Sequence, residues 1–295
     1  MADPPQFRFV QFEFPWAIGP PDGRYVVRDH PEADPAHVLV LGTVGAPRRH
    51  RLRRHRGRAA APDPPPAPVP TMRVTVIRAQ PFADPGEARD WLARADLREL
   101  AGEAVAVVNR AIAAHRAAAH DALARDVAPS QALVTRAGYG EGEEVADGRW
   151  SAARELEAEP PRESRRSAAL RPGERLAALL GARDQTLACE EPVLGARAAL
   201  DGGRMRAAAL LTQVALRAAV TELGAEVSEL SPSDPRAGDM SRRVAELSEL
   251  EGTLAPVSER AMRAEPDQGG GAAVRKALER LEAALRARAA SGPWR

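Results

Sequence analysis

The fold of the first part of the chain is decided by the stretch FRFVQFEF, residues 7–14. Its apolar side chains fall at odd positions up to Phe9 and at even positions from Val10 onwards. Side chains alternate between the two faces of a strand, and one inserted residue resets that alternation. The pattern therefore predicts a strand with a β-bulge near Val10–Gln11.

The residues that follow predict a small antiparallel sheet. Asp22-Gly23 is typical of a hairpin tip, with a return strand over residues 24–28. Strands are expected over 37–44, 72–79 and 131–137, and a short one near Trp150 after a glycine-rich turn at 138–142. Asp84-Pro85 predicts the start of a helix, and the 3-or-4 spacing of apolar residues predicts a longer helix over 104–127. We therefore expect an α+β domain over residues 1–158, an antiparallel meander with two helices on one face.

Between the third and fourth strands lies a segment that we expect to be disordered, an insert over residues 47–70. Residues 48–58 hold seven arginines and two histidines, and residues 61–70 hold six prolines. Charge repulsion and missing backbone donors both oppose packing of such a segment. Arginines on a flexible tether can neutralise phosphates, and without interleaved aromatic residues they would do so regardless of sequence. The candidate nucleic-acid contacts are Arg48, Arg49, Arg51, Arg53, Arg54, Arg56 and Arg58.

The alternative explanation of this cluster is codon bias. The chain has 42 basic residues, of which Lys276 is the only lysine, and Asn109 is its only asparagine. Such a bias toward residues with GC-rich codons is typical of a high-GC bacterial genome. On this interpretation the arginines of the insert form a solvated loop without a function.

Prolines and charged residues over 159–173 predict a linker, and residues 174–295 predict a helical domain. We expect helices over 174–180, 183–200 with a bend or a restart at Pro192, 205–223 ending at Gly224, 241–250 and 274–288. The first part of the chain is thus α+β and the second is all-α.

Motifs for catalysis or cofactor binding are sparse. No lysine follows a glycine-rich loop, as a phosphate-binding loop requires, and the glycines at 138–142 do not match the dinucleotide pattern. His115 and His120 are five residues apart, so on one helix they would point in different directions and not bind one metal. Glu190 and Glu191 follow Cys189 and disfavour its thiolate. We therefore predict no cofactor, no metal site and no catalytic residue.

Composition bears on location and partners. The net charge is +1, so no global field selects an acidic partner. The start of the chain does not resemble a signal peptide, the longest apolar stretch is about half of a membrane span, and there is one cysteine. A soluble, cytoplasmic protein with no membrane contact is expected. Trp16 and Tyr25 either line an exposed ligand or peptide groove or cap the core of the sheet.

The opening stretch over residues 12–25, FEFPWAIGPPDGRY, resembles uncharacterised proteins of high-GC actinobacteria, a resemblance that implies no activity. Our first hypothesis is a non-enzymatic cytoplasmic interaction or scaffold protein whose partner is another protein. One alternative is weak, sequence-independent nucleic-acid binding through Arg48–Arg58. Another is an enzyme with an unrecognised site. The sequence does not indicate whether the protein is a monomer or an oligomer.

Overall fold

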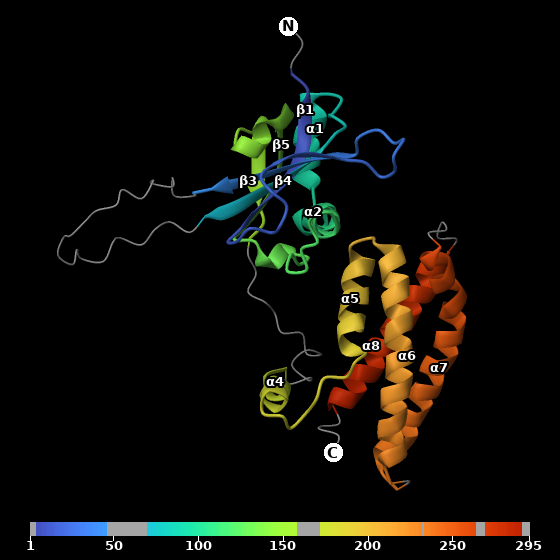
Figure 1. Ribbon diagram of the computed structural model, residues 1–295. Helices are drawn as coiled ribbons and strands as arrows, with labels where there is room; N and C mark the ends of the chain where they lie inside the picture. Colours follow the sequence, from blue (N-terminus) through green and yellow to red (C-terminus); the bar gives the residue numbers. More distant parts are fainter. Residues whose placement is uncertain (1–3, 46–69, 158–171, 232, 264–268, 291–295) are drawn as a thin grey trace, which may run out of the picture. The chain divides into compact units, whose positions relative to one another are not determined.

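The computed structural model describes residues 4–45, 70–157, 172–231, 233–263 and 269–290. Contacts within the chain divide it into two compact units, Met1–Pro160 and Pro161–Arg295 (Figure 1). The first contains an antiparallel sheet with helices, and the described part of the second is helical. The predicted fold class, α+β followed by all-α, is confirmed. The predicted insert and linker fall almost entirely on residues 46–69 and 158–171, outside the described residues.

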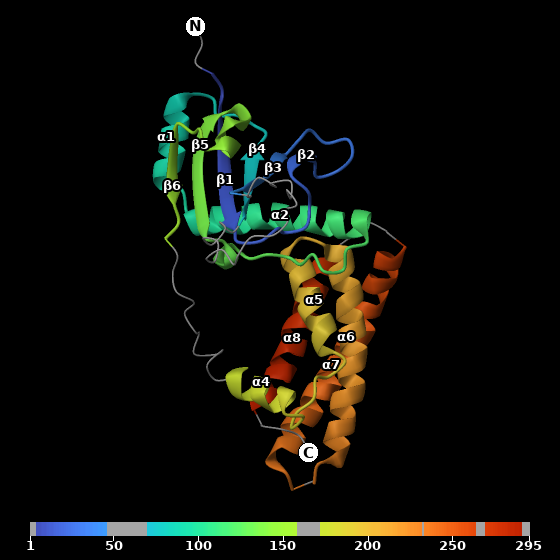
Figure 2. The same ribbon diagram turned by 60° about the vertical axis from the view of Figure 1, so that its left-hand side comes forward.

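The sheet of the first unit has six antiparallel strands in the order β2-β3-β4-β1-β5-β6 (Figure 2). The strands are β1 (Gln6–Phe14), β2 (Gly23–Val27), β3 (His37–Val44), β4 (Thr71–Arg78), β5 (Val134–Glu141) and β6 (Ala152–Glu155). β2, β3 and β4 follow one another as a meander. The first strand of the chain lies instead between β4 and β5.

β1 is regular over its whole length, so the predicted β-bulge is wrong. Its register with β4 runs without a break from Phe9 opposite Ile77 to Phe14 opposite Met72. The change of phase has another cause, which is that both faces of this central strand are buried. Phe9 packs with Val145 on one face, whereas Phe12 packs with the helices' core on the other.

The predicted hairpin between the first two strands is also wrong. Asp22-Gly23 stands at the start of β2, but β2 pairs with β3 and not with β1. The Asp22 carboxylate accepts hydrogen bonds from the backbone N–H and the hydroxyl of Thr43, both at 2.9 Å. Asp22 therefore ties the start of β2 to the end of β3 and leaves β2 at the edge of the sheet.

Two helices cover one face of the sheet, as the sequence predicts. They are α1 (Pro85–Arg94) and α2 (Leu97–Ala119), and the side chains of Asp84 and Asp96 cap their N-termini. α2 runs across the strands (Figure 2) and buries Ala101, Ala104, Val108 and Ile112. The opposite face is covered in part by the 3₁₀ helix η2 (Gly142–Asp147), through Val145.

α2 ends at Ala119, eight residues before the predicted end at Val127. His120 adopts a left-handed conformation with φ 52°, and the Asp121 carboxylate accepts from the backbone N–H of Leu123 and Ala124. Asn109 then holds the returning chain, because its side chain both donates to and accepts from the backbone of Val127. These side-chain bonds compete with the helix and reverse the chain.

The glycines at 138 and 140 lie inside β5 and not in the predicted turn. A Cβ on Gly138 would lie 2.2 Å from the Ala152 carbonyl oxygen, and one on Gly140 would lie 2.9 Å from Cα of Trp150. The two glycines therefore allow the chain around β6 to approach β5 closely.

We expect Gly138→Ala to lower the free energy of unfolding by about 1–3 kcal/mol, because the added methyl group overlaps backbone that must move. Gly42→Ala is the matched control, since Gly42 is also in a strand and a Cβ there meets nothing within 4 Å. The control should change stability by less than about 1 kcal/mol, toward a more stable protein. Urea denaturation measures both, and equal effects would contradict the close approach of β6.

The second unit contains α4 (Pro172–Leu180), α5 (Glu190–Asp201), α6 (Met205–Glu229), α7 (Pro235–Met262) and α8 (Gly270–Ala290). α5 begins seven residues later than predicted, with Pro192 in its first turn, where a missing N–H costs nothing. Gly224 lies inside α6 and does not end it. α7 and α8 both extend beyond their predicted limits.

A buried ion pair links α6 and α8 inside this unit. Arg288 is 2% exposed, and its guanidinium donates to both carboxylate oxygens of Glu226 at 2.8–3.0 Å. An Asp184 carboxylate oxygen lies 3.6 Å from the same guanidinium. The apolar core of this unit consists mainly of leucines and alanines of α5 to α8.

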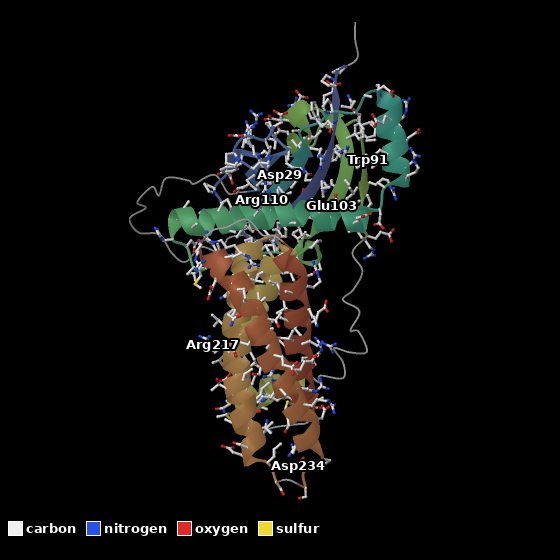
Figure 3. The ribbon with its side chains drawn as sticks, turned by 90° about the vertical axis from the view of Figure 1, so that its right-hand side faces the viewer. Asp29, Trp91, Glu103, Arg110, Arg217 and Asp234 are labelled. Atoms are coloured by element: carbon white, nitrogen blue, oxygen red, sulfur yellow. The ribbon has the colours of Figure 1, made fainter. Side chains whose placement is uncertain are left out.

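Arg288→Ala should lower the free energy of unfolding by about 3–5 kcal/mol, because Glu226 would be left buried without its partner. Arg217, labelled in Figure 3, provides the control, since it pairs with Glu251 at 3.0 Å but its side chain is 76% exposed. Arg217→Ala should cost no more than about 1 kcal/mol. Thermal and denaturant unfolding measure the loss of stability in both variants. Equal losses for Arg288→Ala and Arg217→Ala would contradict a buried ion pair at Arg288.

Candidate functional site

The described part of the first unit contains a groove of about 550 Å³ between the edge strand β2 and α2, the β2–α2 groove. Alanines of α2 form much of one wall, and their small side chains keep the groove open. The apolar residues that line it are Pro20, Pro21, Tyr25, Val26, Val27, Val107, Ala111, Ala114 and Ala118.

Two polar side chains of α2 also line the β2–α2 groove. Arg110 forms an ion pair with Asp29 at 3.2 Å and donates to the Arg28 carbonyl at 2.9 Å, so that it joins α2 to the end of β2 (Figure 3). His115 lies 3.6 Å from the Asp121 carboxylate. The groove is therefore mainly apolar and has polar groups on its helix side.

One side of the groove is a sheet edge. Among the described residues no strand pairs with the outer side of β2. An edge strand presents backbone N–H and C=O groups that can pair with another extended chain. The groove thus combines an apolar wall on α2 with a backbone edge on β2.

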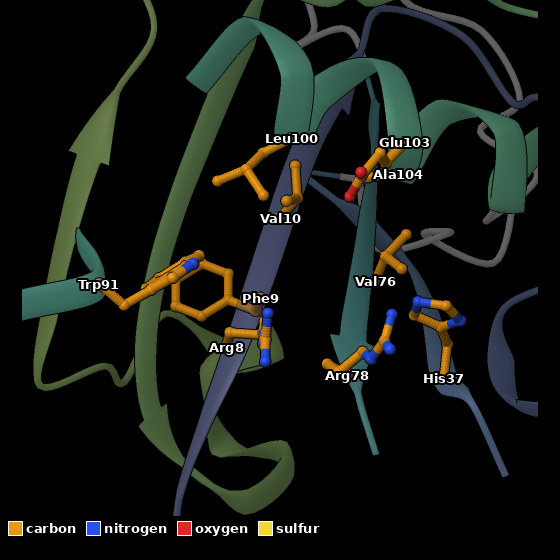
Figure 4. Close-up of a pocket in the computed structure, with 10 residues that line it drawn as sticks. All are labelled: Arg8, Phe9, Val10, His37, Val76, Arg78, Trp91, Leu100, Glu103 and Ala104. Carbon is orange, nitrogen blue, oxygen red and sulfur yellow. The ribbon is translucent and has the colours of Figure 1, made fainter. Parts of the chain in front are cut away.

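A second, smaller hollow of about 60 Å³, the Arg8 pocket, lies along the same helix (Figure 4). Three neighbouring strands supply Arg8 from β1, Arg78 from β4 and His37 from β3, and these side chains lie next to one another (Figure 4). Glu103 reaches toward the pocket from α2. Arg8 also lies against the rings of Phe82 and Trp91, with 5.4 and 5.9 Å to their centroids.

The polar atoms of the Arg8 pocket are incompletely paired. Arg8 Nε and His37 Nδ1 are buried, and neither has a hydrogen-bond partner among the described residues. Burial lowers the pKa of His37, and the positive charge of Arg78 lowers it further. The imidazole is therefore held mainly in its neutral form at neutral pH.

The groove and the pocket follow one face of α2. The helix residues that line them recur every three or four positions, from Leu100 and Glu103 through Val107 and Arg110 to Ala114 and Ala118. On the sheet side, His37 of the pocket stands opposite Val27 of the groove in the β2–β3 register. Both hollows therefore belong to one continuous strip between α2 and the strands.

The structure distinguishes between the two alternatives that the sequence left open for Trp16 and Tyr25, a groove lining or a cap on the core. Tyr25 lines the groove and its hydroxyl donates to the Pro21 carbonyl at 2.8 Å. Trp16 is 42% exposed, packs on Phe14 with 6.0 Å between ring centroids, and does not line the groove. Tyr25 therefore lines the groove and also packs against the core of the sheet, whereas Trp16 contacts that core only through Phe14.

The predicted nucleic-acid contacts, Arg48, Arg49, Arg51, Arg53, Arg54, Arg56 and Arg58, lie outside the described residues. The structure does not place them, and binding through them stays a prediction. Arg8, His37 and Arg78 were not recognised from the sequence. Their only signal is a charged or polar residue in an otherwise apolar strand, and their proximity depends on the strand order.

Two further candidates from the sequence have clear surroundings. His115, which the sequence analysis rejected as a metal ligand, lies 3.6 Å from the Asp121 carboxylate, and the groove lining contains no serine, threonine or cysteine that such a pair would activate. Cys189 is fully buried in the second unit, and burial together with Glu222 and Glu190 raises the pKa of its thiol to about 12. This agrees with the expectation that carboxylates disfavour the thiolate.

Comparisons of the chain with protein-family models, with curated proteins and with solved structures found no match. Within the described ranges, no three histidine, cysteine, aspartate or glutamate side chains are grouped so that they could hold a metal ion. Nor is any helix in those ranges long and apolar enough to cross a membrane. The candidate site therefore rests on the geometry of the groove and the pocket.

The lowered pKa of His37 predicts a pH-dependent contribution to stability. The unfolded state binds a proton near the ordinary histidine pKa, whereas the folded state resists it until a lower pH. Its contribution is thus complete above the unfolded pKa and falls as the solution is acidified. The charged groups around the imidazole are Arg78, Asp29, Arg110, Arg8 and Glu103.

We expect His37→Gln to remove this dependence, because glutamine does not titrate. Denaturant unfolding of wild type and variant between about pH 8 and pH 5 should show that wild type loses more stability on acidification. Parallel pH profiles for the two proteins would contradict a lowered His37 pKa.

Proposed function

We propose that this chain is a non-enzymatic, cytoplasmic interaction protein, and that its first unit binds an extended segment of another protein in the β2–α2 groove. The observation that carries the proposal is the apolar groove beside an unpaired strand edge. A segment added to β2 would gain backbone hydrogen bonds from the edge, while its alternate side chains would enter the groove.

The size and lining of the groove suit such a segment. Its volume of about 550 Å³ accommodates several apolar side chains. The α2 wall is made of alanines, and Ala114 and Ala118 are exposed, so apolar side chains of a partner can approach the helix closely. Burial of apolar surface on this wall would supply the affinity, and the strand edge would fix the direction and register.

The charges at the groove favour a partner with acidic residues. Arg28 and Arg110 line the end toward His37, and Arg8 and Arg78 lie beyond it. Asp29 neutralises Arg110 only in part, since its side chain is 68% exposed. The partner segment is therefore expected to carry apolar residues at alternate positions and a negative charge at one end.

The cytoplasmic location is proposed from the cysteine content. The one cysteine, Cys189, is buried and free, so the chain does not depend on oxidation to fold. Nucleic-acid binding through Arg48–Arg58 and an enzymatic activity stay as alternatives from the sequence.

A displayed library of random linear peptides, selected on the full chain, tests the proposal. Ala114→Arg places a long charged side chain in the groove, and Ala119→Arg places the same side chain on an exposed residue of α2 that does not line the groove and is turned about 140° away from Ala114. Ala114→Arg should weaken the selected peptides by about tenfold or more, while Ala119→Arg should leave their affinity within about twofold.

Hydrogen exchange provides the second measurement. Peptide binding should slow exchange of backbone amides in Gly23–Val27, because a strand added to β2 would bond its outer edge. Equal binding by the two arginine variants, or protection confined to elements other than β2 and α2, would contradict the proposed site.

A further inference from the structure

We infer that the Arg8 pocket is a carboxylate-binding subsite, and that it receives the acidic group of the segment held in the β2–α2 groove. The ligand chemistry is a carboxylate, carried either by the end of a chain or by an Asp or Glu side chain. The link to the groove rests on the proposed function, whereas the pocket itself rests on the side chains described below.

The first support is a pair of neighbouring arginines, neither of which forms an ion pair with a described residue. Val10 and Val76 are opposite each other in the antiparallel β1–β4 register. Arg8 is two residues before Val10 and Arg78 is two residues after Val76, so the two arginines face the same side of the sheet. Like charges opposite each other destabilise a sheet. Neither guanidinium has an ion pair with any described residue, although both belong to well-paired strands.

The other face of the same sheet shows the usual solution. There Arg73 and Arg136 lie 3.1 and 3.7 Å from the carboxylate of Glu13, which stands between them on β1. A glutamate on the central strand thus neutralises the arginines of both neighbouring strands. On the face covered by α1 and α2, no acidic side chain of β1 stands between two arginines in this way. A carboxylate from a ligand would take that position.

The second support is the pair of buried polar atoms without partners. The Arg8 guanidinium is fixed over Phe82 and Trp91, and its Nε always carries a hydrogen to donate. His37 Nδ1 is buried and unpaired within the same pocket. Buried polar groups are almost always paired in folded proteins, so two unpaired atoms on residues that line one small hollow indicate a missing ligand, and the Nε–H of Arg8 requires that this ligand has an acceptor atom.

The charge balance selects a carboxylate over a phosphate. Glu103 faces the pocket from α2 and offsets one of the two arginines, and His37 is held mainly neutral. The remaining charge is matched by an anion with a single negative charge. A dianion would be repelled by Glu103, whereas a carboxylate can accept two parallel N–H bonds from a guanidinium.

The spacing along α2 connects the subsite to the groove. Glu103 and Ala114 are eleven residues apart on the helix, which corresponds to roughly 16 Å at 1.5 Å per residue. An extended chain covers that distance in about five residues. A short acidic segment can therefore place its carboxylate in the Arg8 pocket and its apolar side chains against Ala111 and Ala114.

Titration of the full chain with sodium acetate, followed by NMR of the His37 ring, tests the pocket itself. His37→Gln identifies the His37 signals, and sodium chloride at the same ionic strength controls for salt. Acetate should shift these signals saturably and raise the His37 pKa, and chloride should do neither. An unsaturable shift, or the same shift with chloride, would overturn the inference.

Variants make the test specific. Arg78 is exposed and its side chain has no hydrogen bond to a described residue, so Arg78→Gln should fold normally and weaken acetate binding by about tenfold or more. Arg94→Gln removes another exposed arginine, from α1 outside the pocket, and should have no effect. Arg8→Lys keeps the charge but loses the planar fork, and should also weaken binding. Tighter binding of inorganic phosphate than of acetate would overturn the carboxylate assignment.

Peptides chosen in the library experiment then distinguish the two sources of the carboxylate. Amidation of the C-terminus weakens binding if the terminal group enters the pocket, and Asp→Asn or Glu→Gln weakens it if a side chain does. If neither change matters, the carboxylate subsite is refuted while the groove stands. If acetate binds but no peptide does, the proposed function fails and the anion pocket remains.

Discussion

The first unit depends on the position of β1, which has a strand on each side and packed side chains on each face. Phe9 and Gln11 point toward η2, and Gln11, although fully buried, is satisfied by Thr75 and Arg136. Phe12 and Phe14 point toward α2 and are fully buried. Because the alternation is strict, burial of both faces fixes the direction of every side chain on the strand. The same alternation turns Arg8 toward the helix-covered face and into the Arg8 pocket.

Much of the secondary structure could be predicted because its signals are local. The strand His37–Val44 has the predicted limits, and Asp84 caps α1, as predicted, through bonds that involve only the next few residues. The order of the strands could not be predicted, since a pattern of alternation shows that a strand exists but not which strand pairs with it. The regularity of β1 was missed for the same reason, because the cover on its second face comes from η2, about 130 residues further along the chain. The end of α2 depends on Asn109 bonding back to Val127, which is again a contact of the folded chain.

The candidate site was less accessible to prediction than the fold. Tyr25 was named with Trp16 as a candidate groove residue because the two flank the Pro20-Pro21 turn, and Tyr25 is the one that lines the groove. The pocket residues come from three strands that are adjacent only in the folded sheet, and none of them belongs to a recurring motif. The most conspicuous charged segment, Arg48–Arg58, gave the clearest hypothesis from sequence but lies outside the described residues. Composition thus drew attention to a run of arginines, whereas the structure draws attention to two arginines on separate strands.

The two faces of the sheet treat positive charge differently, and this difference carries the functional argument. On the η2 side, Glu13 neutralises Arg73 and Arg136, and Arg136 also bonds Gln11 and lies over Trp150. On the α2 side, neither Arg8 nor Arg78 forms an ion pair with a described residue, and the buried Nε of Arg8 has no hydrogen-bond partner there. A protein is only marginally stable, so an arrangement that costs stability without packing benefit is unexpected unless it serves a function. Departures from such local rules are typical of functional sites, where the missing partner belongs to the ligand. The loss of stability is modest at the Arg8 pocket because the neighbouring rings of Phe82 and Trp91 stabilise the Arg8 guanidinium when no anion is bound.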